Sequence, residues 1–191
     1  MPGKEKAVLL DCDGVLFTLV DHCGEYGVSP RVQSEIVVID ELGALLDKAI
    51  ALGFKIICHT NQPDLSRGKV SAEFIEKKHE MLREKYPQIA DIFICPHTET
   101  DLCSCRKPKP GLLRQAGKKY DLDFSKCWVV GDSRGDIEAG TLVHAKTIFV
   151  QTRYNCGSPA IDIATVIAKN TKGALTLIIA LETGEKITDD V

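Results

Sequence analysis

The sequence lacks any apolar run long enough to cross a membrane. A polar lead is followed by only four apolar residues, AVLL at 7–10, and the longest late stretch, ALTLIIAL at 174–181, has eight. A membrane-spanning helix needs roughly 20 apolar residues, and a signal peptide needs a longer apolar core than AVLL. We therefore expect a cytoplasmic protein with no membrane partner.

An excess of positive charge is also missing. The 24 Lys and Arg residues are outnumbered by 27 Asp and Glu residues, which gives a net charge of −3. Because proteins that bind duplex nucleic acid usually carry a basic surface, no nucleic-acid partner is expected. The sequence shows no repeats, no low-complexity tracts and no clear linker. Its 191 residues suit a single domain, 1–191, which we expect to act as a monomer.

Five short apolar runs are present instead, at 7–10, 55–58, 91–94, 127–130 and 147–150. They are continuous rather than alternating, which is typical of strands buried on both faces of a parallel sheet. Helical patterns separate them, and further elements are expected: an edge strand within 160–167, a closing helix at 172–182 and a helix with Pro110 in its first turn. The fold class predicted is α/β, a doubly wound, Rossmann-like parallel sheet of about five to six strands with helices on both faces and no separate cap domain.

Four aspartates follow two of these runs. Asp11 and Asp13 come directly after the run at 7–10, and Asp132 and Asp136 come after the run at 127–130. In doubly wound sheets the chemistry lies beyond the carboxyl ends of the strands, so we expect these side chains to converge. Converging carboxylates repel one another unless a hard cation such as Mg²⁺ binds between them. Taken singly, each aspartate is explained equally well by a turn or a helix cap.

Neutral donors and a cation accompany these carboxylates. Thr60 and Asn61 follow the run at 55–58 and offer a hydroxyl and an amide, groups that bind a phosphoryl oxygen without adding charge. Lys107 offers a compact positive charge to a phosphoryl group or to an attacking carboxylate. A Thr-Asn pair after a strand is by itself a common turn.

Together these motifs resemble the haloacid dehalogenase superfamily. The sequence DCDG at 11–14, Thr60 at a strand end, Lys107 before a helix, and GDSRGD at 131–136 occur in that family's order and cover nearly the whole chain. The resemblance implies a phosphatase, in which Thr60 and Lys107 bind the phosphoryl oxygens.

The resemblance also implies roles for the four aspartates. Asp11 would be the nucleophile that forms an aspartyl-phosphate, and Asp13 would protonate the leaving alkoxide and then activate water. Mg²⁺ would be bound by Asp11, the backbone carbonyl of Asp13 and Asp132, with Asp136 in the outer shell.

Three of the eight cysteines cluster with a histidine. Cys95 and His97 are separated by five residues from Cys103 and Cys105, and four such ligands can close a tetrahedral Zn²⁺ site. Metal binding could order the loop 95–105, which is too short for a core of its own. The alternatives are free surface thiols or a disulfide, and a disulfide is disfavoured in a reducing cytosol.

The same loop is similar to that of the capless, zinc-containing branch of heptose-bisphosphate and histidinol-phosphate phosphatases, on the motifs TNQ, RGK and CPH…CSCRKPKPG. This resemblance implies that Arg106 recognises a distal phosphate or hydroxyl groups of the substrate. Asn61 and Gln62 would contact the phosphate side. Asp21 and His22 resemble a substrate-contacting segment, and a solvated loop is the alternative for them.

The function expected is a Mg²⁺-dependent phosphomonoesterase acting on a small phosphorylated metabolite through an aspartyl-phosphate. The resemblance favours the 7-phosphate of a D-glycero-D-manno-heptose 1,7-bisphosphate, followed by histidinol phosphate and then by a polynucleotide 3′-phosphate. A receiver-like signalling domain and a zinc-binding adaptor are the alternatives from other classes. Neither explains the full set of aspartates, since a receiver carries its phosphorylated aspartate on a later strand.

Overall fold

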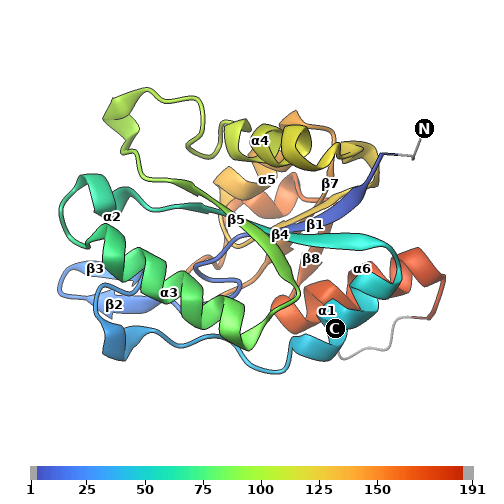
Figure 1. Ribbon diagram of the computed structural model, residues 1–191, viewed down its shortest axis with the longest axis horizontal. Helices are drawn as coiled ribbons and strands as arrows, with labels where there is room; N and C mark the ends of the chain where they lie inside the picture. The colour runs from blue at the N-terminus through green and yellow to red at the C-terminus, as the bar shows by residue number, and fades with distance from the viewer. Residues whose placement is uncertain (1–3, 187–191) are drawn as a thin grey trace.

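The computed structural model describes residues 4–186, and in them the apolar runs form a six-stranded parallel sheet with strand order β5-β4-β1-β6-β7-β8 (Figure 1). The central strands are apolar on both faces because helices cover both. The predicted fold class is therefore confirmed. The strands are β1 (Lys6–Leu10), β4 (Phe54–Asn61), β5 (Ile89–Cys95), β6 (Trp128–Gly131), β7 (Lys146–Val150) and β8 (Val166–Ala168).

Alternate residues of β1 enter two different cores. Val8 and Leu10 pack in the larger core, which contains buried residues of α1, α3 and α6, whereas Ala7 and Leu9 pack against α4 and α5 on the other face (Figure 1). Within residues 4–186, none of the helices is long and apolar enough to span a membrane. The helices are α1 (Gly43–Ala51), α2 (Pro63–Ser66), α3 (Ala72–Lys85), α4 (Gly111–Tyr120), α5 (Arg134–Leu142) and α6 (Thr171–Thr183).

The segment between β1 and α1 forms a small antiparallel hairpin of β2 (Val20–His22) and β3 (Glu25–Val28). It lies near α2 and α3 rather than in the central sheet, and over residues 4–186 no separate cap domain is present (Figure 1). This hairpin and the loop between β5 and α4 are the structural additions to the sheet that flank its carboxyl edge.

Two local predictions need correction. The edge strand expected within 160–167 begins later, because Pro159 and the Ser158 cap start a short 3-10 helix, Pro159–Asp162, and only Val166–Ala168 pairs with β7. Pro110 is the N-cap of α4, and Gly111 is the first helical residue. The closing helix is confirmed as α6.

Candidate active site

The turn after β1 brings the first aspartates to the carboxyl edge of the sheet. Asp11 follows β1, and its backbone N–H donates to the Val130 carbonyl of β6 at 2.9 Å. Gly14 has a φ of 87°, and a side chain at this position would collide with the Asp132 carboxylate. Glycine therefore allows both the left-handed turn and the close approach of Asp132 to the β1 turn.

Lys107 lies between two carboxylates of this edge. Its Nζ is 2.7 Å from Asp11 Oδ1 and 2.5 Å from Asp136 Oδ1, and it donates to the His59 carbonyl at 3.3 Å. Lys107 and both carboxylates are buried. The side chains of Asp11, Asp132 and Asp136 each offer an oxygen within 4.8 Å of the others, which is a geometry suited to a cation.

Burial and mutual repulsion alter the protonation of this cluster. Burial, together with the charge of Asp136, raises the pKa of Asp11 from 3.8 to about 7. Burial and the charge of Asp11 also raise the pKa of Asp132. Burial acts in the same direction on Asp136, but the charge of Lys107 together with hydrogen bonds from Lys107 and Ser133 lowers the pKa of Asp136 overall. The cluster therefore holds more negative charge than Lys107 alone can compensate.

The raised pKa of Asp11 makes the stability of the protein depend on pH. Its folded-state pKa of about 7 lies above the ordinary 3.8, so its contribution to stability is complete below about pH 4 and is lost as pH rises through about 7. We expect the melting temperature of magnesium-free protein to fall between about pH 5.5 and about pH 8. Saturating Mg²⁺ should remove much of that fall, and an identical fall with and without Mg²⁺ would contradict the cation site.

The carboxylate of Asp13 points away from this cluster. Its Oδ1 pairs with the fully buried Lys78 of α3, and its Oδ2 accepts hydrogen bonds from Ser29 Oγ at 2.9 Å and from Gln62 Nε2 at 2.8 Å. Burial opposes its ionisation, but Lys78 together with the hydrogen bonds from Gln62 and Ser29 more than offsets this and lowers the pKa of Asp13. Sequence reasoning missed Lys78, since a lysine within a charged helix gives no sign that it is buried.

The strand-end residues of β4 hold their neighbours in place. The Asn61 side chain donates to the Lys107 carbonyl at 3.3 Å and accepts from the Lys107 N–H at 3.1 Å. Gln62 donates to Thr60 Oγ1 at 2.9 Å as well as to Asp13, and both Thr60 and Gln62 are buried. Asn61 and Gln62 line the cleft described next, where they position the two charged residues beside them.

A cleft of about 290 Å³ opens beside these residues, and we call it the strand-end cleft. Its lining includes Asp11, Asp13 and Asp132, as the sequence predicted for this edge of the sheet. The lining also includes five further charged residues, of which only Arg106 was predicted as a substrate contact and Arg67 was noted only within the RGK motif. These are Glu25, Arg31, Asp64, Arg67 and Arg106.

The cysteine-histidine cluster has the geometry of a four-ligand site. Cys105 Sγ lies 3.2 Å from Cys95 Sγ, 3.5 Å from Cys103 Sγ and 3.3 Å from His97 Nδ1. Cys95 Sγ is 3.7 Å from Cys103 Sγ and 3.6 Å from His97 Nδ1. Zinc–ligand bonds of about 2.0–2.3 Å in a tetrahedron place ligands about 3.5–3.8 Å apart, so the donor set fits zinc.

The cluster directly precedes the Arg-Lys pair. The N–H of Arg106 donates to Cys103 Sγ at 3.3 Å, and its guanidinium donates to the His97 carbonyl at 3.2 Å and pairs with Glu99. Arg106 lines the strand-end cleft. The backbone N–H of Arg106 is thus held by a sulfur atom that belongs to the cluster.

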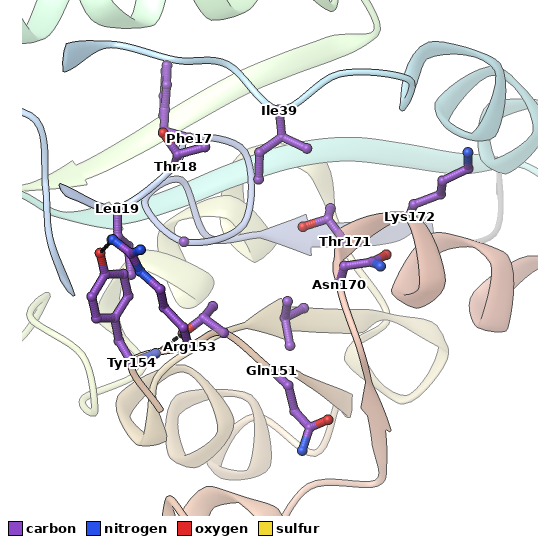
Figure 2. Close-up of a pocket in the computed structure, with 13 residues that line it drawn as sticks. Phe17, Thr18, Leu19, Ile39, Gln151, Arg153, Tyr154, Asn170, Thr171 and Lys172 are labelled. Atoms are coloured by element: carbon purple, nitrogen blue, oxygen red, sulfur yellow. Dashed lines mark hydrogen bonds between the residues drawn. The ribbon is translucent and has the colours of Figure 1, made fainter. Parts of the chain in front are cut away.

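Asp21 and His22 lie in the hairpin and are not among the residues that line the strand-end cleft. Asp21 accepts from the Gly27 N–H at 3.0 Å and pairs with Arg153 at 3.2 Å. Arg153 lies against the Tyr154 ring at the rim of a second pocket of about 490 Å³, shown in Figure 2. His22 Nε2 is 3.5 Å from a Glu35 carboxylate oxygen. Gly27 lines the cleft, but Asp21 and His22 do not, and their charged partners Arg153 and Glu35 lie outside it. The geometry therefore gives no direct support to Asp21 and His22 as substrate contacts.

The fold, the carboxylates at the strand ends and the similarity to known proteins together show to which protein family the chain belongs. A family model described as HAD-hydrolase-like matches residues 104–158. The chain is 37% identical over 143 residues to a Pseudomonas aeruginosa protein, and the match covers 73% of this chain and 70% of that protein. It is 38% identical over 151 residues to a Pseudomonas putida protein, and that match covers 77% of this chain and 83% of the relative. The chain belongs to the haloacid dehalogenase-like phosphatases.

Both Pseudomonas relatives are named D-glycero-beta-D-manno-heptose-1,7-bisphosphate 7-phosphatase. A Photorhabdus laumondii relative, 36% identical over 153 residues (72% of this chain and 78% of that protein), is named for the alpha anomer. Among solved structures, the D,D-heptose 1,7-bisphosphate phosphatase of B. bronchiseptica, complexed with magnesium and phosphate, superposes with a TM-score of 0.78 at 24% identity and covers 92% of this chain and 99% of that one. At this level of identity, the structural similarity supports the assignment of the fold.

Proposed function

We propose that the protein is a Mg²⁺-dependent phosphomonoesterase that removes the 7-phosphate of a D-glycero-D-manno-heptose 1,7-bisphosphate. The observation that carries this proposal is the likeness to relatives of that name over most of both chains, 38% identity across 83% of one of them. The arrangement of Lys107 between Asp11 and Asp136 supports phosphoryl chemistry at the strand ends. Both anomers occur among the relatives' names, so the proposal does not choose between them.

We infer two half-reactions from the resemblance to the haloacid dehalogenase family. In the first, Asp11 attacks phosphorus, an aspartyl-phosphate bond forms, the ester P–O bond breaks and Asp13 gives a proton to the departing sugar oxygen. In the second, Asp13 takes a proton from water, the water oxygen bonds to phosphorus, and the Asp11 carboxylate is released. Lys107, in contact with Asp11, neutralises the negative charge that the phosphoryl oxygens bring.

Asp11, Asp132 and Asp136 supply the carboxylate oxygens that would hold Mg²⁺, since one oxygen of each lies within 4.8 Å of the others. Lys107, which pairs with Asp11 and Asp136, offsets one of the three negative charges. When bound, Mg²⁺ draws electron density from the phosphoryl group and makes phosphorus more open to attack. The carboxylate of Asp13 pairs with Lys78 and accepts hydrogen bonds from Ser29 and Gln62, and these contacts lower its pKa. It must therefore take up a proton in the substrate complex before it can protonate the departing sugar oxygen.

The cysteine-histidine cluster is proposed as a structural zinc site. All four ligands, Cys95, His97, Cys103 and Cys105, come from one loop, and a site with four protein ligands leaves no open position for substrate or water. Its role is then to fix the backbone that carries Arg106 and Lys107.

Histidinol phosphate is the second candidate substrate, because the five residues between His97 and Cys103 also suit the histidinol-phosphate branch. A polynucleotide 3′-phosphate ranks third, since the net charge of −3 provides no basic surface for a nucleic acid.

Initial rates of phosphate release from these three substrates test the proposal. We expect heptose 1,7-bisphosphate to give a kcat/KM at least about 100-fold above histidinol phosphate and a 3′-phosphorylated oligonucleotide, which corresponds to about 2.7 kcal/mol of transition-state discrimination. Omission of Mg²⁺ serves as the control and should stop turnover. A higher kcat/KM for either of the other substrates would overturn the assignment while leaving the enzyme a phosphatase.

A further inference from the structure

A buried ion pair in the lining of the strand-end cleft joins two separate segments. Arg31 Nε lies 2.7 Å from Asp64 Oδ2, and the two side chains are only 14% and 10% exposed. Arg31 follows the hairpin, whereas Asp64 lies in α2 after β4. Removing one partner of such a pair leaves an uncompensated buried charge, so each member holds the other in position.

The same two segments also meet at Asp13. Ser29 and Gln62 both donate to Asp13 Oδ2, at 2.9 and 2.8 Å. Two residues further along each segment stand Arg31 and Asp64. On each segment, two residues of chain therefore connect the ion pair to a hydrogen bond with Asp13. Asp13 is the carboxylate that transfers the proton in the proposed reaction.

Asp64 holds two guanidinium groups, one on each oxygen. Arg67 Nη1 lies 3.3 Å from Asp64 Oδ1, on the opposite side from Arg31. On Arg31, Nε is taken by Asp64 and Nη1 by Glu25 at 2.5 Å, while Nη2 has no hydrogen bond among residues 4–186. Glu25 is 40% exposed and also pairs with Lys69, so its carboxylate is far easier to displace than that of Asp64.

We propose that Arg31 is a specificity-determining residue that binds the anionic group at the end of the substrate opposite the reacting phosphoryl group, and that Asp64 is the positioning residue that aims it. The inference rests on the proposed function for the direction in which the substrate lies. A planar guanidinium matches two phosphate oxygens, and a phosphate dianion entering the cleft replaces the exposed Glu25 carboxylate on Arg31. Arg67 stands beside it as a second donor.

The test compares a sugar bisphosphate with a substrate that has no second anion. For heptose 1,7-bisphosphate and p-nitrophenyl phosphate, the ratio of the two kcat/KM values should fall at least about tenfold in Arg31→Met, mainly through KM for the bisphosphate. In Asp64→Asn it should fall about threefold. The matched control is Arg83→Met, which removes a surface arginine paired with Glu76 at 3.1 Å and should leave the ratio unchanged.

A double variant separates positioning from a general structural effect. If Asp64 acts through Arg31, Arg31→Met/Asp64→Asn should show the same ratio as Arg31→Met alone. Equal losses for both substrates in Arg31→Met, or no change in the ratio, would overturn the proposal. Melting temperatures of the variants confirm that folded protein is being compared.

Failure of the proposed function would be recognised separately. If the wild-type protein did not turn over heptose 1,7-bisphosphate, the substrate assignment would fall, and Arg31 would be tested by inhibition of p-nitrophenyl phosphate turnover. Fructose 1,6-bisphosphate should then inhibit more strongly than fructose 6-phosphate, and Arg31→Met should reduce that preference at least about tenfold. A preference that Arg31→Met leaves unchanged would sink the inference.

Discussion

Asp11→Asn is expected to lower kcat for Mg²⁺-dependent phosphate release by at least about 10⁴-fold, because the amide cannot form the aspartyl-phosphate bond. The substitution is nearly isosteric and removes one of the negative charges that crowd Asp132 and Asp136. Since burial and repulsion already raise the pKa of Asp11 to about 7, the fold should tolerate a neutral group at this position. Activity should therefore disappear without a loss of melting temperature.

The matched control is Asp91→Asn, which removes the same charge from an ion pair with Lys119 at 2.6 Å, away from the strand-end cleft. Its kcat should remain within about twofold of the wild type. The measurement is p-nitrophenyl phosphate turnover in Mg²⁺ at several protein concentrations, with melting curves for both variants. Substantial turnover by Asp11→Asn would show that another group attacks phosphorus.

Loss of zinc is expected to impair catalysis although no ligand of the cluster touches the reacting atoms. The protein as purified should contain about one zinc per chain. Removing it releases the Cys103 and Cys105 sulfur atoms that order the backbone before Arg106 and Lys107, including the bond from the Arg106 N–H at 3.3 Å. Since supporting shells of this kind alter activity by about 10–100-fold, kcat/KM should fall at least about tenfold.

The experiment strips zinc with a chelator, restores Mg²⁺ and then measures kcat/KM alongside metal content. Cys105→Ser should reproduce the loss, and Cys156→Ser, which alters an exposed cysteine outside the cluster, should not. Zinc-free protein with unchanged kinetics would refute the link between the cluster and the Arg-Lys pair. Protein that never contained zinc, with the three loop thiols freely titratable, would refute the cluster as a zinc site.

The sheet and the aspartates at its carboxyl edge could be predicted from the sequence for the same reason. Continuous apolar runs mark strands buried on both faces, and the residue after each run must lie at the carboxyl edge. Asp11, Thr60 and Asp132 could therefore be placed together without any knowledge of long-range contacts. The cysteine-histidine cluster could be predicted equally well, because its four residues fall within eleven positions of the chain.

The ion pairs around the cleft could not be predicted, because they join residues that are distant in sequence. Lys78 reaches Asp13 across 65 positions and Arg31 reaches Asp64 across 33. No periodicity marks either partner, and a lysine or arginine among other charged residues is typical of a solvated surface. Asn61 lines the cleft, and its amide also holds the Lys107 backbone across 46 positions, a contact that no sequence pattern marks.

The central claim is that this chain removes the 7-phosphate of a heptose 1,7-bisphosphate, and ³¹P NMR of that reaction tests it most directly. With wild-type protein and Mg²⁺, the resonance of the 7-phosphate should be replaced by that of inorganic phosphate while the 1-phosphate resonance remains. Loss of the 1-phosphate, or a spectrum that stays unchanged while p-nitrophenyl phosphate is hydrolysed, would contradict the account.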